Sequence, residues 1–240
     1  MNLPLVTGEF ASATPGGRPV RWAATGRFGG ESRAPWNGLN LADHVGDDPD
    51  SVRRNRQSLE TTLGLKGAVY LNAEHGARVH SVAAPRTLAP GDACITGESL
   101  LGLVALGADC ATVGIAGHSF IAVIHCGWRG LVAGVIPAAL NELAQVDPGP
   151  FFAVLGPHIC VNCYPVGGEV WEAVRASSLM AAVSACEQLQ VSLRAGIVEQ
   201  AKPWDVHWTM IGDCTYEADD FYSHRRDGIT GRHGLVIWRT

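Results

Sequence analysis

An unbroken apolar run in the middle of the chain predicts a buried strand that leads into a helix. Residues 120–126 read FIAVIHC. Because this run is apolar without alternation, we expect a strand that is buried on both faces. Its one ionisable imidazole is His125. After the glycine-flanked turn 127–130, apolar residues recur at spacings of three and four, as in an amphipathic helix. They are Leu131, Val132, Val135, Ile136, Ala139, Leu140 and Leu143.

The junction between this strand and this helix is a candidate site. His125 should lie where the strand ends, next to the free N–H groups of the helix start, which favour anions. Arg129 adds a permanent positive charge at the same point. Taken alone, the pattern fits an ordinary strand–turn–helix equally well.

A second helix is predicted after the pair Asp48-Pro49. An aspartate can cap the free N–H groups of a helix start, and proline suits the first turn. The helix should run to residue 63 and end at Gly64. We expect Asn55 and Arg56 to lie on its solvated surface.

Short apolar segments separated by Gly and Pro predict a series of strands. They are residues 20–24, 68–71, 79–82, 93–96, 101–106, 111–116, 120–126 and 151–155, with a closing strand at 235–238. Further helices are expected after Val166-Gly167-Gly168 and over residues 179–189, whereas 195–208 has no assignment. From residue 68 onwards, six strands precede one long helix, which is not the βαβα alternation of a doubly wound fold and indicates an α+β fold or a sandwich with helices outside. Without a repeat or linker, residues 1–240 should form a single domain.

Composition limits the class of protein and its partners. Of the 240 residues, 47% are hydrophobic and 17% are charged, which is typical of a globular chain with a sizeable core. The net charge of −5 and the lack of a Lys/Arg run argue against nucleic acid or an anionic membrane as partner. Residues 1–17 lack the pattern of a signal peptide, so we expect a cytoplasmic protein, either a monomer or a weak homodimer.

The cysteines do not suggest a disulfide framework. Their number, seven, is odd, and no export signal accompanies them. Cys160-x-x-Cys163 is a lone pair and only a weak sign of zinc or redox chemistry.

Three candidate metal ligands follow or end apolar segments. His75 comes after 68–71, Cys110 after 101–106, and His125 ends its own strand. If these strands are neighbours, the two imidazoles and the thiolate form a zinc set with an open fourth position. The same residues also fit buried histidines and an inert cysteine. Alternatively, Cys110 is a nucleophile with a histidine as its base and Asp109 as the group that orients it.

An arginine-rich segment is the third candidate. Residues 223–232 carry Arg225, Arg226 and Arg232 among Gly, Ser and Thr, a composition that suits phosphate or carboxylate. The alternative is a solvated loop with an internal Arg–Asp pair.

Together these segments resemble the laccase-domain family, also called the YfiH-like or polyphenol oxidase family, whose enzymes are associated with purine nucleoside phosphorolysis. The resemblance extends from Arg27 to Ile237. Its residues are Arg27 with Gly29-Gly30 and Ser32; Asn40-Leu41; His44 to Pro49; Asn55-Arg56; His75-Gly76; Ala108-Asp109-Cys110; His125 with Gly127 to Gly130; Gly156-Pro157; Tyr164 with Val166-Gly167; and Ser223 with Arg225 to Gly228 and Thr230 to Arg232.

The resemblance implies a four-layer α/β/β/α fold with two packed mixed sheets. It implies metal ligands at His75, Cys110 and His125, with zinc as the expected ion and copper as the older alternative. We expect Asp109 to carry a proton or to orient a ligand. Substrate or phosphate should be bound by Asn40, Arg129, Arg225 and Arg226.

The expected activity is zinc-dependent phosphorolysis of adenosine, inosine, guanosine or methylthioadenosine, with adenosine deamination as a second activity. Three alternatives stay open: a copper-dependent polyphenol oxidase, a cysteine hydrolase that uses Cys110, and a non-catalytic metal-binding module. Copper chemistry is the weaker reading, because the chain has a single His/Cys/His set and three methionines, none of them near Cys110.

Three positions depart from the family pattern. Ala73-Glu74 replaces a usual Gln-Val, which lends some support to the non-catalytic alternative. Cys126 replaces an alanine, and it should point away from His125 because neighbouring strand residues face opposite sides. His224 replaces an aromatic residue.

Overall fold

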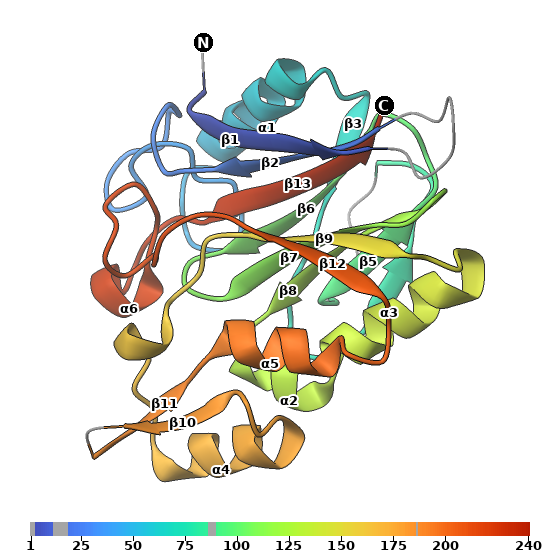
Figure 1. Cartoon of the computed structure of the whole chain (residues 1–240). Helices are drawn as coiled ribbons and strands as arrows, with labels where there is room; N and C mark the ends of the chain where they lie inside the picture. The colour runs from blue at the N-terminus through green and yellow to red at the C-terminus, as the bar shows by residue number, and fades with distance from the viewer. Residues whose placement is uncertain (1–2, 12–18, 86–89, 186) are drawn as a thin grey trace.

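Two mixed β-sheets packed face to face form the centre of the fold, as the computed structural model of residues 3–11, 19–85, 90–185 and 187–240 shows (Figure 1). The first sheet has the order β1 (Leu5–Phe10), β2 (Val20–Thr25), β13 (His233–Arg239), β6 (Leu101–Gly107) and β3 (Gly67–Tyr70). The second has the order β12 (Val206–Met210), β9 (Phe151–Leu155), β7 (Ala111–Ala116), β8 (Ile121–Cys126), β5 (Ala93–Thr96) and β4 (Val79–Ser81).

Both sheets combine parallel and antiparallel pairs. Most neighbours are antiparallel, whereas β3 runs parallel to β6, β4 to β5 and β12 to β9. This confirms the prediction of an α+β fold with two packed mixed sheets.

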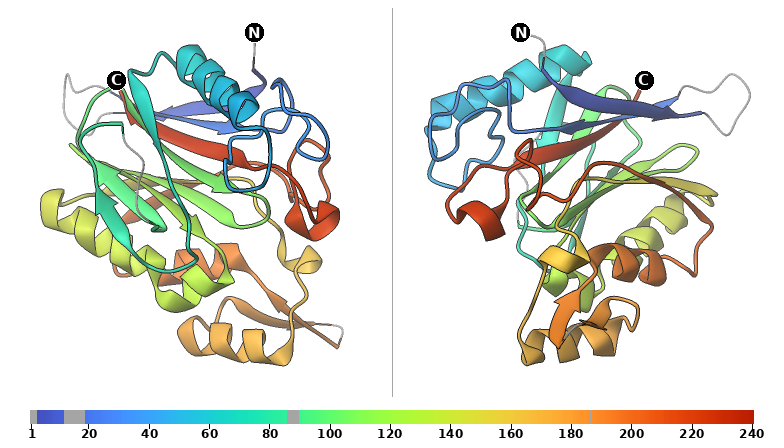
Figure 2. Two further views of the ribbon diagram at one scale, coloured as in Figure 1. Left: turned by 180° about the vertical axis from the view of Figure 1, so that it is seen from behind. Right: turned by 60° about the vertical axis from the view of Figure 1, so that its left-hand side comes forward.

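Helices cover the outer face of each sheet (Figures 1 and 2). On the first sheet, α1 (Pro49–Leu63) buries Leu59 in a cluster with Val104 and Val236. On the second sheet lie α2 (Trp128–Ala133), α3 (Val135–Val146) and α5 (Leu193–Gln200). Beyond them, α4 (Gly168–Ser177) packs on the hairpin β10 (Ala182–Ala185) and β11 (Gln188–Val191). The layers therefore follow the order α/β/β/α.

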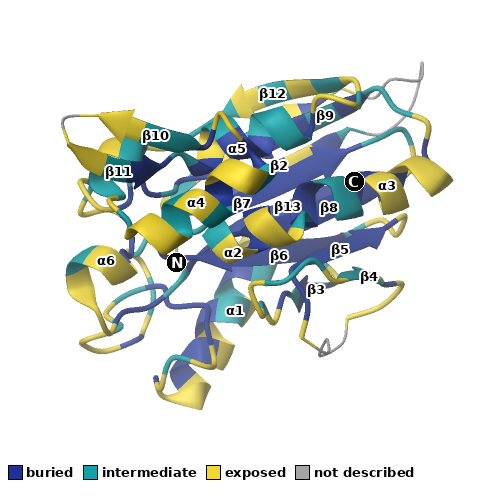
Figure 3. Ribbon diagram, turned by 90° about the horizontal axis from the view of Figure 1, so that it is seen from below, coloured by how far each residue is buried: buried dark blue, intermediate teal, exposed yellow. Residues whose placement is uncertain are grey.

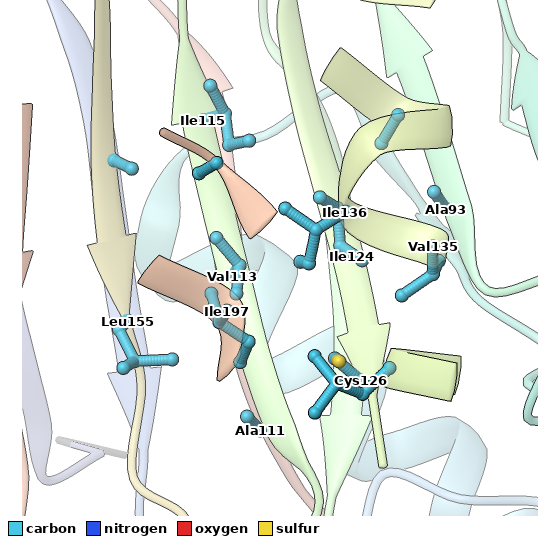
Figure 4. Close-up of a cluster of buried hydrophobic side chains, with 14 of the residues drawn as sticks. Ala93, Ala111, Val113, Ile115, Ile124, Cys126, Val135, Ile136, Leu155 and Ile197 are labelled. Carbon is cyan, nitrogen blue, oxygen red and sulfur yellow. The ribbon is translucent and has the colours of Figure 1, made fainter. Parts of the chain in front are cut away.

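Strand β8 shows how the alternation of side chains positions the site. Ala122, Ile124 and Cys126 face the helices, where Figure 4 shows Ile124 beside Ile136 of α3. Ile121 and Val123 face the other sheet. His125 follows the second set, because strand side chains alternate with a period of two. The strand is buried along its whole length, as the dark ribbons of Figure 3 show.

The predicted helix after Asp48 is confirmed, but the assignment of Asn55 to its solvated surface is wrong, and Arg56 is partly buried. Asp48 accepts from the backbone N–H groups of Asp50 and Ser51, and Gly64 ends the helix at φ 68°. Asn55 is 1% exposed, not solvated. Its side chain donates to Ser32 Oγ at 2.9 Å, so it ties α1 to the preceding loop.

Two further helix predictions need correction. The single helix expected from Leu131 is two helices, because Gly134 takes a left-handed conformation at φ 78° between α2 and α3. Residues 179–189 do not form a helix: within the described residues, β10 and β11 pair antiparallel there. The Trp171 side chain of α4 donates to the Val183 carbonyl at 2.9 Å, so tertiary contacts favour the strand.

The unassigned segment 195–208 contains most of α5 and the start of β12. The described chain also has the short helices η1 (Val161–Cys163) and α6 (His224–Asp227). None of the helices in the described ranges is both long and apolar enough to cross a bilayer.

Candidate metal centre and active site

Two imidazoles and one thiol converge at one end of the inner layers. The nearest ligand atoms of His75, Cys110 and His125 all lie within 4.8 Å of one another. The two imidazole rings meet edge to face, with centroids 5.0 Å apart. His75 comes from the loop after β3, Cys110 directly precedes β7, and His125 lies in β8. The antiparallel pairing of β7 with β8 sets Thr112 opposite His125 and so brings Cys110 to the end of the same strand.

Asp92 holds two of these residues in place. Its buried carboxylate meets His125 Nδ1 at 2.8 Å and accepts from the backbone N–H of His75 at 3.0 Å. The N–H groups of Glu74 and Gly76 add bonds of 3.2 and 2.7 Å. The carboxylate therefore shapes the His75 loop, in which His75 itself has φ 62°, and leaves Nε2 of His125 for the centre.

Sequence reasoning missed Asp92. A carboxylate directly before the buried strand 93–96 was the available signal, since an acid that enters a core needs a partner there.

Asp109, the carboxylate expected to orient a histidine, forms its hydrogen bonds with other groups. It accepts from Thr215 Oγ1 and from the backbone N–H of Arg225, each at 2.7 Å. Asp109 thus links the turn that carries Cys110 to the arginine-rich segment.

The electrostatics favour a thiolate beside a charged imidazole. Burial raises the pKa of Cys110, but the positive charges and hydrogen bonds of His125 and His75 outweigh it and bring that pKa to about 6. Burial lowers the pKa of His125, while Cys110 and Asp92 raise it to about 9. For Asp92 as well, burial raises the pKa, but its hydrogen bonds keep it below the ordinary value.

This donor set fits a metal ion. A thiolate and two imidazole nitrogens are ligands that zinc and copper both take, and three protein ligands leave a position open. Gly127 preserves the space: a Cβ there would lie 2.8 Å from Cys110 Sγ and 3.4 Å from His75 Cδ2. Cys126 points to the opposite side into the core, where burial raises its pKa.

Two of the predicted substrate residues are fully engaged in the protein. Asn40 is 0% exposed; its amide donates to Asp47 Oδ2 at 2.8 Å and accepts from the Arg232 N–H at 2.9 Å. Arg226 donates to four backbone carbonyls and forms an ion pair of 2.9 Å with Asp227. Both side chains hold loops together.

Arg129 and Arg225, the other two residues predicted to bind substrate or phosphate, are exposed near the centre. Arg129 stacks over the Trp128 ring at 4.3 Å, and Arg225 lies over the Tyr164 ring at 5.2 Å. Burial raises the pKa of Tyr164, as does the negative charge of Cys110, whereas the charges of Arg225 and Arg129 lower it. The charges of both arginines and of the thiolate therefore all influence the pKa of the Tyr164 hydroxyl.

Arg232 is the third cation of the arginine-rich segment, and it was not among the residues expected to bind substrate or phosphate. Burial lowers its pKa, and the negative charges of Cys110 and Asp109 raise it. Its guanidinium donates to the Thr230 and Gly231 carbonyls at 3.0 and 2.9 Å. Arg232 thus contributes positive charge to the same side of the centre.

Comparisons with known proteins agree on one family. The family profile described as multi-copper polyphenol oxidoreductase laccase matches residues 21–240. A Streptomyces coelicolor protein named purine nucleoside phosphorylase is 38% identical over 225 residues, which cover 89% of this chain and 93% of that protein. Escherichia coli YfiH, also named purine nucleoside phosphorylase, is 35% identical over 222 residues, or 88% of this chain and 90% of YfiH.

A solved structure shares the fold. The crystal structure of a hypothetical protein YfiH from Bacillus licheniformis superposes with a TM-score of 0.86 at 26% identity. The superposition covers 92% of this chain and 93% of that chain.

Proposed function

The chain belongs to the laccase-domain, YfiH-like family, and from this premise we propose that it is a zinc-dependent purine nucleoside phosphorylase. The observation that carries the proposal is the convergence of His75, Cys110 and His125 beside two exposed arginines. Relatives that match nine-tenths of the chain bear the name of this activity. The substrates would be adenosine, inosine, guanosine and methylthioadenosine.

His75, Cys110 and His125 would hold the zinc ion. When bound there, zinc supplies a Lewis acid that polarises a substrate oxygen. The chain prepares the ligands in advance: Asp92 orients His125, and the neighbouring imidazoles keep Cys110 in its thiolate form. Gly127 keeps the approach to the thiolate open.

Arg129 and Arg225 would bind phosphate. In phosphorolysis a phosphate oxygen forms a bond to C1′ of the ribose while the bond from C1′ to the purine nitrogen breaks. Two guanidinium groups that hold the phosphate in place lower the entropic cost of that encounter and stabilise its charge. Their cation–π stacking on Trp128 and Tyr164 restrains both side chains before the phosphate arrives.

Tyr164 and Asp109 would assist in different ways. The Tyr164 hydroxyl is protonated at neutral pH, as that of an ordinary tyrosine also is, and can donate a hydrogen bond to an anion held by the arginines. Both oxygens of Asp109 accept hydrogen bonds, from Thr215 and from the Arg225 backbone. Asp109 is therefore proposed as a positioning residue that holds Arg225 relative to Cys110.

Adenosine deamination is the second activity that we propose. The three protein donors leave one position for water, and attack of water on the amino-bearing carbon of adenine would give inosine and ammonia. This reaction needs no phosphate, so the two activities can be separated by leaving phosphate out.

A product assay tests both activities. The zinc-replete chain is incubated with each nucleoside, with and without phosphate, and the products are separated by chromatography. We expect free base and ribose 1-phosphate, or its methylthio analogue, only with phosphate, and inosine from adenosine without it. Both should disappear in His125→Ala. A zinc-replete chain that converts none of the nucleosides would overturn the proposal.

The same preparation tests the alternatives. Oxygen uptake with a phenol after copper loading would support the polyphenol oxidase reading. Alkylation of Cys110 that proceeds equally with and without zinc would support a cysteine hydrolase, because a bound thiolate is protected. Zinc binding without turnover of any substrate would leave a metal-binding module.

The cytoplasm is the compartment that we propose for this activity. Reducing conditions there keep a thiolate such as Cys110 available as a ligand. Nucleosides and phosphate are both present in that compartment.

A further inference from the structure

A second group of metal-binding side chains lies outside the proposed active site. Cys160, Cys163, Cys214 and Glu217 each offer a ligand atom, and these atoms all lie within 4.8 Å of one another. We call this group the Cys3Glu cluster. None of its members belongs to the His75, Cys110 and His125 centre. Its three thiols are free of disulfide bonds.

Two tight turns build the cluster. The Cys163 N–H donates to the Cys160 carbonyl at 3.2 Å, so η1 places the side chains of the Cys-x-x-Cys pair on one side. The Glu217 N–H donates to the Cys214 carbonyl at 3.1 Å, so a second turn places the side chains of Cys214 and Glu217 on one side. Each turn therefore presents residues i and i+3 together.

The two turns face each other across 54 positions of sequence. The Cys160 N–H donates to Cys214 Sγ at 3.2 Å, and Cys163 Sγ donates to Glu217 Oε1 at 3.4 Å. A β-bridge between His158 and Cys214 aligns the backbones next to the cluster. The four donors are thus held by backbone contacts that do not depend on an ion.

We propose that the Cys3Glu cluster binds a structural zinc ion. Three soft thiolates with one carboxylate form a closed set of four, the number that structural zinc sites use. All three cysteines are partly exposed, so an ion can reach them, whereas Cys126 lies fully buried in the apolar core. Binding would release the thiol protons to solvent.

The zinc ion would connect the two loops that flank the active site. Cys163 directly precedes Tyr164, and Cys214 directly precedes Thr215, whose hydroxyl donates to Asp109. Arg226 binds the carbonyls of the same turn, at Thr215, Tyr216 and Ala218. A bound ion closes a long loop between these segments and so restricts both. The zinc would support the active site without contacting substrate.

Metal analysis of a chain without the first centre provides the test. His75→Ala/His125→Ala removes two ligands there and leaves the Cys3Glu cluster intact. After dialysis against zinc and then buffer, we expect one zinc per folded chain. Adding Cys163→Ser or Cys214→Ser should remove it, and adding Glu217→Gln should weaken it. Cys94→Ala, which changes a cysteine on β5, is the matched control and should keep the ion.

Cobalt provides a second measurement that needs no further variant. In the same parent chain, Co²⁺ bound by three thiolates should show strong sulfur-to-cobalt charge transfer and tetrahedral visible bands. One equivalent should saturate the signal, and zinc should abolish it.

Three results would overturn the inference. The folded parent could bind no zinc and give no thiolate–cobalt spectrum. The cysteine variants could keep as much zinc as the parent. Thiol titration could show two of the three cysteines oxidised to a disulfide in the protein purified under reducing conditions. Because the parent lacks the first centre, none of these results depends on phosphorolysis.

Discussion

Asp92 and His125 are joined by two bonds of equal length. The backbone N–H of His125 donates to the Asp92 carbonyl at 2.8 Å, and Nδ1 of the imidazole meets Oδ1 of the carboxylate at 2.8 Å. The backbone hydrogen bond belongs to the sheet, and the side-chain hydrogen bond belongs to the site. The strand pairing that builds the core therefore also sets the direction of the imidazole.

Replacing Asp92 should weaken metal binding without removing a ligand. Asp92→Asn keeps the shape but loses the negative charge and one acceptor for His125 and the backbone N–H groups of the His75 loop. Loss of such a partner costs roughly 10- to 100-fold in metal affinity. Zinc competition with a chromophoric chelator measures it. Asp205→Asn, at an exposed carboxylate beside His207, is the control, and equal affinities in the two variants would contradict this role.

Gly127→Ala should block the centre. The added Cβ would lie 2.8 Å from Cys110 Sγ, closer than carbon and sulfur can approach. The thiol or the turn must move, so we expect loss of zinc and a drop in turnover of at least tenfold. Gly168→Ala is the matched control, because nothing lies within 4 Å of its Cβ. Measured zinc content and kcat should separate the two variants, and wild-type values in Gly127→Ala would refute the prediction.

Arg129→Ala and Arg225→Ala should raise the KM for phosphate. A charge-assisted hydrogen bond is worth about 1.5–3 kcal/mol, so each loss should raise KM by about 10-fold or more. Initial rates at varied phosphate and fixed inosine provide the measurement. Arg175→Ala tests specificity, since Arg175 also stacks over a tryptophan, Trp171, but lies on α4 and bonds Glu172. Unchanged KM in both site variants would place the phosphate elsewhere.

Arg226→Ala should behave differently from these two variants. It removes the donor to four carbonyls and the partner of Asp227, so the loop from Thr215 to Phe221 loses its internal support. We expect a loss of about 2–4 kcal/mol in the free energy of unfolding. Urea denaturation measures this loss. A stable variant with a raised KM for phosphate would show instead that Arg226 binds substrate.

The sequence was informative where one local pattern decides the structure. The strand 121–126 and the capped start of α1 follow from apolar runs and from Asp48-Pro49. The order of the elements predicted the α+β class, and the family resemblance implied the two packed mixed sheets. The hairpin β10–β11 was missed, because its stability comes from contacts with α4 such as the Trp171 bond to Val183.

The site shows the same division. His75 and Cys110 follow apolar segments and His125 ends one, so their side chains could be selected before their convergence was known. Asp92 could not be paired with His125, because strand order in a mixed sheet is set by packing of distant segments. Asn40 and Arg226 look like ligands in sequence, but their bonding capacity is used within the protein.

His233 should make the protein less stable as the pH falls from neutral. The residue is 1% exposed on β13, and burial lowers its pKa from 6.5 to about 4. Between these values the unfolded chain binds a proton that the folded chain does not. The free energy of unfolding therefore falls as the pH drops through this range, by up to about 3 kcal/mol for this group.

A leucine at this position should flatten that dependence. Urea unfolding of the wild type and of His233→Leu at pH 7 and at pH 4.5 gives the two differences to compare. His44 and His158, whose pKa values burial also lowers, contribute equally in both proteins. Asp92 and Asp147 have pKa values below the ordinary 3.8, so their stabilisation is lost mainly at lower pH. The same loss in both proteins would mean that His233 gains its proton without unfolding.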